Sequence, residues 1–151
     1  MYRGRIKQIF HVSNALRNDC CHIANMVGGD VGYMYNMIQN DVSELGNTMF
    51  IHLINNQVCG FIKGQLAPLP KYVDFAKGLT AAKIDWIYVC RWNHRQGIGS
   101  QLLAAYSDYM KDNGAQYLHL YAAPSEQSKK FWREKHGFEV IGWNNLMGKA
   151  L

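Results

Sequence analysis

The chain has 151 residues, of which 48% are hydrophobic and 18% charged, and its formal net charge is +5. These values predict one folded domain over residues 1–151, exclude a mainly disordered chain, and favour an anionic partner. No run of 18 apolar residues and no signal peptide occurs, so we expect no membrane partner. The four cysteines include no C-x-x-C pair, which indicates reduced thiols and a cytoplasmic protein.

The first half of the chain predicts a strand, two helices and a hairpin. In chain order we expect a strand over residues 2–10, helices over 14–27 and 31–45, and strands over 48–54 and 57–65. Glycines after residues 27 and 45 suit the ends of the two helices. The pair Asn55-Asn56 tolerates the positive φ of a two-residue turn, so the two later strands should form a hairpin.

The second half alternates strands and helices. We expect a loop over residues 66–80, a strand over 82–90, a helix over 99–112, a strand over 117–122, a helix from Pro124 to about His136, and one or two strands over 138–151. The strand over 82–90 is apolar at both parities, as in a central strand. Strand, helix and strand in this order favour a parallel crossover. The fold class is therefore α/β, with a mixed sheet and helices on both faces.

The turn between the central strand and the following helix is a candidate anion site. Gly97 and Gly99 let the backbone curl close to a ligand, and the first N–H groups of a helix have no intrahelical partner. Arg95, Gln96 and Ser100 add donors around them. A third glycine at the Rossmann spacing is missing, and so is the lysine of a P-loop. The turn therefore favours a phosphate or pyrophosphate, and neither the Rossmann motif nor the P-loop motif accounts for it.

Two segments carry a resemblance to a known family. The residues from His94 to Gly99 resemble the R/Q-x-x-G-x-G/A motif with which the GNAT superfamily of N-acetyltransferases holds the pyrophosphate of acetyl-CoA. His94 departs from the first position of that motif. Downstream, Ser125, Ser128, Phe131 and Trp132 followed by Gly137-Phe138 look like the family's N-x-x-A-x-x-F-Y…G-F segment, with one residue more than usual before the glycine.

The resemblance implies a fold and a co-substrate. It implies a mixed, mostly antiparallel central sheet in which the fourth and fifth strands are parallel and splayed, and acetyl-CoA bound beside them. It also implies that family members are often dimers, so a homodimer is one expectation. Carried over to this chain, the cofactor-binding residues would be Ile87, Val89, His94, Arg95, Gln96, Gly97, Ile98, Gly99, Ser100, Ser125, Ser128 and Phe131.

Candidate catalytic groups lie on the central strand. A backbone N–H near Val89 is the natural donor to a developing oxyanion. Asp85 is the only carboxylate in the strand and, by simple alternation, shares a face with Ile87 and Val89, which makes it a candidate base. An ion pair with a structural role is the equally weighted alternative. Trp132 stands where the family often has a tyrosine that protonates the CoA thiolate, and an indole N–H cannot do this.

The resemblance therefore implies an acetyl-CoA-dependent N-acetyltransferase that acts on a primary amine by direct attack in a ternary complex. The acceptor would be a small molecule or a protein amine. Two alternatives stay open: a toxin-like acetyltransferase of aminoacyl-tRNA, and a non-catalytic module that binds CoA. Basic residues such as Arg3, Arg5, Lys7 and Arg17 are sparse for a committed RNA-binding surface, so the sequence does not favour a nucleic acid.

Overall fold

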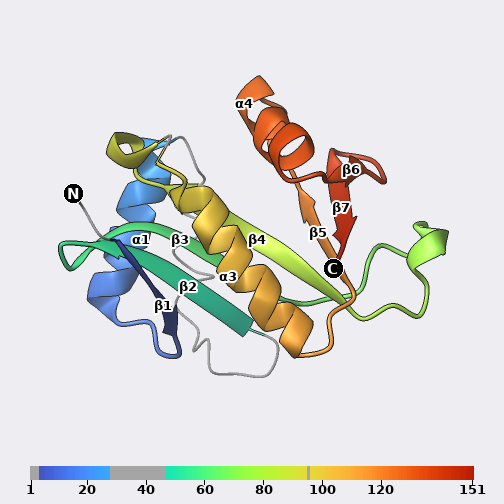
Figure 1. Ribbon diagram of the computed structural model, residues 1–151, viewed down its shortest axis with the longest axis horizontal. Helices are drawn as coiled ribbons and strands as arrows, with labels where there is room; N and C mark the ends of the chain where they lie inside the picture. Colours follow the sequence, from blue (N-terminus) through green and yellow to red (C-terminus); the bar gives the residue numbers. More distant parts are fainter. Residues whose placement is uncertain (1–3, 28–46, 95) are drawn as a thin grey trace.

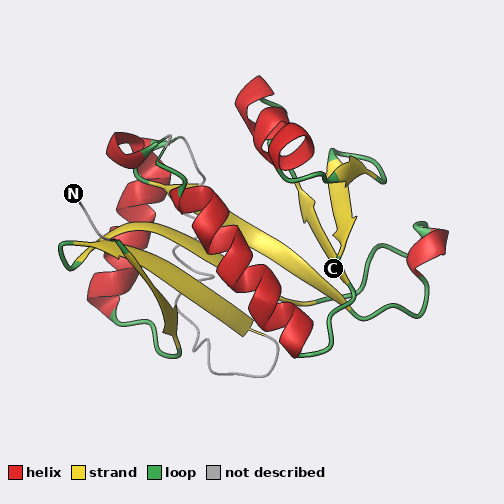
Figure 2. Ribbon diagram, viewed as in Figure 1, coloured by secondary structure: helices red, strands yellow, loops and turns green. Residues whose placement is uncertain are grey.

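The computed structural model describes residues 4–27, 47–94 and 96–151. Its sheet has seven strands in the order β1-β2-β3-β4-β5-β7-β6. Helices cover both faces of this sheet, as Figures 1 and 2 show. The main elements are β1 (Arg5–Ile9), α1 (Asn14–Met26), β2 (Asn47–Ile54), β3 (Gln57–Leu66), β4 (Ala81–Val89), α3 (Ile98–Asp112), β5 (Tyr117–Tyr121), α4 (Glu126–Lys129), β6 (Glu139–Val140) and β7 (Leu146–Ala150).

The strands alternate between two hydrophobic cores. On β3, Phe61 packs with Cys20 and Ala24 of α1, whereas the next residue, Ile62, packs with Leu102 of α3. This alternation follows from the two-residue period of a strand and explains why β2 and β3 are apolar at nearly every position. None of the helices in the described residues is long and apolar enough to cross a membrane.

Strands β4 and β5 are the only parallel pair in the described sheet, and they separate after a short contact. Their pairing runs from Ala81 opposite Tyr117 to Lys83 opposite His119 and goes no further. All the other described strand pairs are antiparallel. The mixed sheet with parallel, splayed fourth and fifth strands is therefore confirmed, and Figure 1 shows β5 diverging from β4.

A bulge in β4 corrects one expectation. Gly64 lies opposite Ile84 and Lys63 lies opposite Trp86, so Asp85 is an extra residue in the β4 ladder. Ile84 packs in the α3 core and Trp86 against the α1 core. Simple alternation therefore fails here, and Asp85 does not share a face with Ile87 and Val89. A bulge depends on the pairing with β3, which the local pattern of β4 does not reveal.

The turn residues behave as their chemistry predicts. Asn55 and Asn56 have φ values of 52° and 62°, as the two-residue hairpin between β2 and β3 requires. Helix α3 begins at Ile98, one residue before the expected start. The second helix, expected over residues 31–45, lies outside the described residues.

The segment after β5 differs from the single helix expected up to His136. It consists of the four-residue α4 and a π-helical stretch, η3 (Lys130–Lys135). The N–H of Phe138 donates to the carbonyl of Trp132 over 2.9 Å, and the N–H of Gly137 donates to that of Arg133 over 3.1 Å. A π-helical turn holds one residue more than an α-helical turn. The extra residue before Gly137 is thus absorbed inside the helix.

Candidate active site

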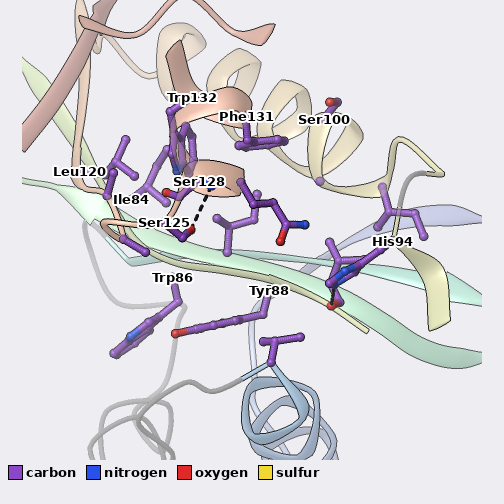
Figure 3. Close-up of a pocket in the computed structure, with 18 of the residues that line it drawn as sticks. Ile84, Trp86, Tyr88, His94, Ser100, Leu120, Ser125, Ser128, Phe131 and Trp132 are labelled. Atoms are coloured by element: carbon purple, nitrogen blue, oxygen red, sulfur yellow. Dashed lines mark hydrogen bonds between the residues drawn. The ribbon is translucent and has the colours of Figure 1, made fainter. Parts of the chain in front are cut away.

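A cleft lies where β4 and β5 separate, and it is closed by the start of α3 and by α4 and η3. Its volume is about 490 Å³, within the range of roughly 300–1,000 Å³ typical of small-molecule sites. Figure 3 shows Phe131 and Trp132 on one side of β4, and Trp86 and Tyr88 on the other. Both groups line the cleft, which therefore opens toward both faces of the sheet.

The start of α3 is a preformed set of donors. Gly97 adopts φ +76° and ψ 10°, and no side chain of the described residues caps the helix there. The N–H groups of Ile98, Gly99 and Ser100 therefore lack an intrahelical acceptor and lie at the positive end of the helix dipole. A Cβ added at Gly99 would lie 3.2 Å from Phe131 Cε2. The first glycine is thus needed for its conformation and the second for close packing.

Beyond Lys83, one edge of β4 is not paired with another strand among the described residues. The N–H of Cys90 donates to the carbonyl of Cys59 over 2.7 Å. In an antiparallel ladder only alternate residues bond to a given neighbour, so the N–H groups of Val89 and Ile87 point to the opposite edge. That edge faces the cleft, because the pairing with β5 has already ended at Lys83. It can therefore accept an extended ligand as an added strand.

The His94 side chain is hydrogen-bonded to the backbone of this edge. Its Nε2 donates to the carbonyl oxygen of Val89 over 2.9 Å. This contact leaves the N–H of Val89 as the free polar group of that residue on the cleft side. His94 itself is exposed and lines the cleft.

The wall opposite β4 is built by α4 and η3. Ser125 caps α4 by accepting a hydrogen bond from the N–H of Ser128 over 3.1 Å, which Figure 3 marks with a dashed line. Trp132 is buried and packs edge-on against Phe131 and Phe138, at centroid distances of 4.8 Å and 5.1 Å. The indole fills the wall as an apolar group.

A hydrogen bond joins this wall to the helix start. Ser100 Oγ lies 2.9 Å from His136 Nε2. Burial lowers the pKa of His136, and the nearby Lys135 and Lys149 lower it further. The neutral imidazole favoured by these effects can accept a hydrogen bond from the Ser100 hydroxyl, so the contact holds α3 and the end of η3 together.

Asp85 lies in a half-buried polar cluster on the side of the sheet that faces α1. Gln65 Nε2 donates to its Oδ2 over 3.5 Å, and Lys83 Nζ lies 3.8 Å from its Oδ1. Burial raises the pKa of the Asp85 carboxyl, while Lys83, Lys63 and His119 oppose the rise. A carboxyl with a raised pKa in a cleft is a candidate proton acceptor.

Two members of this cluster were not expected to have a role. Lys63 is only 4% exposed, and its Nζ lies 5.5 Å from the centroid of the Trp86 ring. His119 is 2% exposed, and its Nε2 donates to the carbonyl of Ala67 over 2.9 Å. Its Nδ1 has no hydrogen-bond partner within the described parts of the chain. The one available signal was a lysine inside the apolar strand 57–65.

The structure gathers most of the expected cofactor-binding residues. Gln96 is exposed and does not line the cleft, and Arg95 lies outside the described residues. The expected residues that line the cleft are Ile87, Val89, His94, Gly97, Ile98, Gly99, Ser100, Ser125, Ser128 and Phe131, and Asp85 lines it with them.

A second polar group lies in the α3 core and away from the cleft. His52 Nδ1 is 3.1 Å from Cys59 Sγ, and His52 Nε2 is 2.8 Å from Gln101 Oε1. A cysteine next to a histidine that contacts a third polar group is also the arrangement of a cysteine nucleophile with its general base. Burial, however, raises the pKa of the Cys59 thiol to about 11, so the thiolate that such chemistry needs is strongly disfavoured. We assign this group to the core.

Comparisons with known proteins show which proteins share this fold. Among curated proteins, none matches the chain in sequence. A GNAT-family protein from Desulfovibrio desulfuricans has a TM-score of 0.78 at 11% identity and covers 98% of this chain and 99% of its own. An aminoglycoside N-acetyltransferase in complex with CoA gives 0.73 at 14% identity, with 94% and 91% covered.

A third solved structure extends this likeness. The PaiA N-acetyltransferase of Thermoplasma acidophilum in complex with coenzyme A gives a TM-score of 0.71 at 18% identity, with 97% of this chain and 99% of that chain covered. The family model for acetyltransferases of the GNAT family matches residues 16–138, a range that begins inside α1 and contains β2 to β5, the glycine turn and the α4–η3 wall. The chain therefore belongs to the acetyltransferase (GNAT) family.

Proposed function

We propose that the chain transfers an acetyl group from acetyl-CoA to a primary amine by direct attack within a ternary complex. The observation that carries this proposal is the open edge of β4 beside a helix start with free N–H groups. The cleft is accessible from both faces of the sheet, so a donor and an acceptor can approach β4 from opposite sides. This arrangement needs no covalent intermediate on the protein.

The donor side fits a CoA chain. The N–H groups of Ile98, Gly99 and Ser100 would hold the pyrophosphate, because they have no intrahelical acceptor and lie at the positive end of the dipole of α3. The free edge at Ile87 and Val89 would bond the pantetheine amides as an added strand does. Acetyl-CoA would supply an activated thioester carbonyl for attack by the amine.

Backbone donors and one carboxylate would serve the reaction. Either the N–H of Val89 or the equally oriented N–H of Ile87 would donate to the oxygen on which negative charge develops, because the two groups lie roughly 7 Å apart and one oxygen can reach only one of them. Asp85 would accept the amine proton through water. At about 3.3 Å per residue, Asp85 lies roughly 7 Å along the strand from Ile87 and roughly 13 Å from Val89. Of the two donors, Ile87 is therefore the one nearer to Asp85.

No acid is required at Trp132. A thiol has a pKa of about 8.5, so its anion is a fair leaving group near neutral pH. The buried indole would pack against acetyl-CoA, and water would protonate the CoA thiolate that leaves. The cytoplasm is the proposed compartment, since Cys20, Cys21, Cys59 and Cys90 are all free thiols.

A thiol-release assay tests the proposed function. Acetyl-CoA is offered together with peptides, polyamines, aminoglycosides, amino acids or charged tRNA. Release of CoA and mass spectrometry of an N-acetylated acceptor are the expected results. Tight CoA binding without turnover on any amine would instead support a non-catalytic module, and turnover on charged tRNA alone would support the toxin-like alternative.

Proline substitutions test the backbone donors. Because the N–H groups of Ile87 and Val89 are not ladder donors, proline at either position removes a cleft donor and spares the bonds to β3. Losing one such donor costs about 10²–10³-fold in kcat. We expect the larger loss for Ile87→Pro. Tyr88→Pro is the matched control, since it removes a ladder bond and should lower stability more than either. Unchanged kcat in both cleft variants would reject the assignment.

A further inference from the structure

The buried ammonium of Lys63 lacks an ion-pair partner among the residues that the structure describes. There, Lys63 Nζ makes no salt bridge and no hydrogen bond, and its one polar contact is with the ring face of Trp86. A charge that is nearly removed from water is costly unless a counter-charge or hydrogen bonds compensate it. Burial accordingly lowers the pKa of Lys63, and Asp85 opposes this.

A second ammonium lies beside the cleft on the same side: Lys63 and Lys83 do not line the cleft themselves, but each contacts a residue that does. Lys83 Nζ lies between Asp85, whose Oδ1 is 3.8 Å away, and the ring of Tyr121, whose centroid is 5.6 Å away. Asp85 and Tyr121 both line the cleft. This corner therefore holds two lysines and one carboxylate, and Asp85 is the only carboxylate that lines the cleft within the described residues. The corner therefore has a net positive charge beside the cleft.

We propose that the acceptor is a compact primary amine that carries a carboxylate a few bonds from the amine, and that Lys63 and Lys83 bind that carboxylate. The inference rests on the proposed function, because it assigns the acceptor side of the same cleft. The amine would then lie within reach of Asp85 through water, while its carboxylate would give Lys63 a second counter-charge besides Asp85. A charge-assisted hydrogen bond of this kind compensates the buried ammonium.

The same charges disfavour other amines. A polyamine or an aminoglycoside would bring several ammonium groups next to Lys63 and Lys83, with one carboxylate already engaged by Lys83. Like charges repel strongly at a half-buried site, where the effective dielectric constant is low. An alternative role for the lysines is to lower the pKa of any bound amine, so that more of it is the neutral nucleophile. That role would not distinguish a carboxylate from an amide.

Matched acceptor pairs test the inference. Thiol release from acetyl-CoA is measured with glycine and glycinamide, β-alanine and β-alaninamide, and phenylalanine and phenylalaninamide, at equal concentrations of the free base. Spermidine and an aminoglycoside are tested in parallel. We expect kcat/KM to be higher for the carboxylate of at least one pair by roughly tenfold or more, as loss of a charge-assisted bond implies.

Variants assign the preference to Lys63. Lys63→Met keeps the length of the buried stem and removes the charge, so the ratio of carboxylate to amide should fall toward one. Lys63→Arg keeps a cation and should retain most of the ratio. Lys77, which is exposed and paired with Asp74, provides the control Lys77→Met, which should change nothing. Thermal unfolding of each variant shows whether it is folded.

The outcomes separate the two proposals. Preference for amides or polycations, or an equal loss for both members of every pair in Lys63→Met, overturns the inference and leaves acetyl transfer standing. Absence of turnover with every amine overturns the proposed function. In that case calorimetry with N-acetylglycine and the CoA-loaded protein still tests the anion site: binding lost in Lys63→Met supports it, and no binding to the wild type rejects it.

Discussion

The left-handed conformation of Gly97 gives a prediction with a magnitude. An L-residue other than glycine loses about 1–2 kcal/mol in this region, and restriction of the unfolded chain offsets about 0.4–1 kcal/mol for Gly→Ala. No atom of the described residues lies within 4 Å of a Cβ added at Gly97, so no clash with them contributes. Gly97→Ala should therefore cost about 1 kcal/mol net, from backbone conformation alone.

This cost can appear in two measurements. If the turn keeps its shape, the free energy of unfolding falls by the whole amount, which lowers Tm by about 2–4 °C in a chain of this size. If the free protein relaxes the turn, stability is spared and CoA binding carries the cost, because the α3 N–H groups must be brought back. The sum of the two losses should then be about 1 kcal/mol. Denaturant unfolding and calorimetry with CoA measure the two parts.

Two variants serve as controls for Gly97→Ala. Gly97→Asn should lose less in the summed free energy, because asparagine tolerates the left-handed region. Gly114, at the other end of α3, has φ +93° and likewise no described atom near an added Cβ. Gly114→Ala should lower stability by a similar amount and leave CoA binding unchanged. A summed loss below about 0.3 kcal/mol for Gly97→Ala, or an equal loss in Gly97→Asn, would refute the reasoning.

Three further predictions concern the cleft and its lining. Asp85→Asn should lower kcat about 10²-fold and abolish the acidic limb of the pH–rate profile. Burial raises the pKa of Asp85 above its usual 3.8, so the wild-type enzyme loses this base as pH falls. A limb that persists in the variant would exclude Asp85 as the base. Trp132→Phe should keep kcat within a few-fold while unfolding becomes easier by about 1–3 kcal/mol, and a selective loss of kcat would give the indole a chemical role. Burial lowers the pKa of His119 below 6.5, so the imidazole binds a proton more tightly in the unfolded chain than in the folded one. The free energy of unfolding should therefore fall as pH drops below about 6.5. Denaturant unfolding at two pH values should show a smaller fall in His119→Gln.

Local chemistry in the sequence is enough to predict the turns and caps that shape the proposed donor side of the cleft. The positive φ at Gly97, the paired asparagines of the hairpin turn and the cap at Ser125 are each determined by one or two residues and their neighbours. Such features depend on backbone sterics and nearby hydrogen bonds, which a linear pattern records. The glycine turn and the downstream Ser125 to Phe138 segment therefore suffice to predict a candidate donor site, and the structure brings residues of both segments together in one cleft.

The acceptor side depends on contacts between distant segments. The bulge at Asp85 arises from the register between β3 and β4, and it moves that carboxylate to the face of Lys63 and Lys83. His119 joins the cluster only because β5 pairs with β4 at Lys83. No period within a single strand records which residues of another strand lie opposite. The pattern of β4 alone therefore predicts the wrong face for Asp85.

The π-helical turn of η3 also bears on how this chain tolerates changes in length. In an α-helix each residue turns by about 100°, so an inserted residue would rotate all later side chains away from their neighbours. Here the wider turn takes up the residue, and Phe138 still packs against Trp132. The π-helical turn thus keeps the register of the residues that follow it despite the added residue. The helix acts as a length buffer between a constrained binding wall and a constrained sheet.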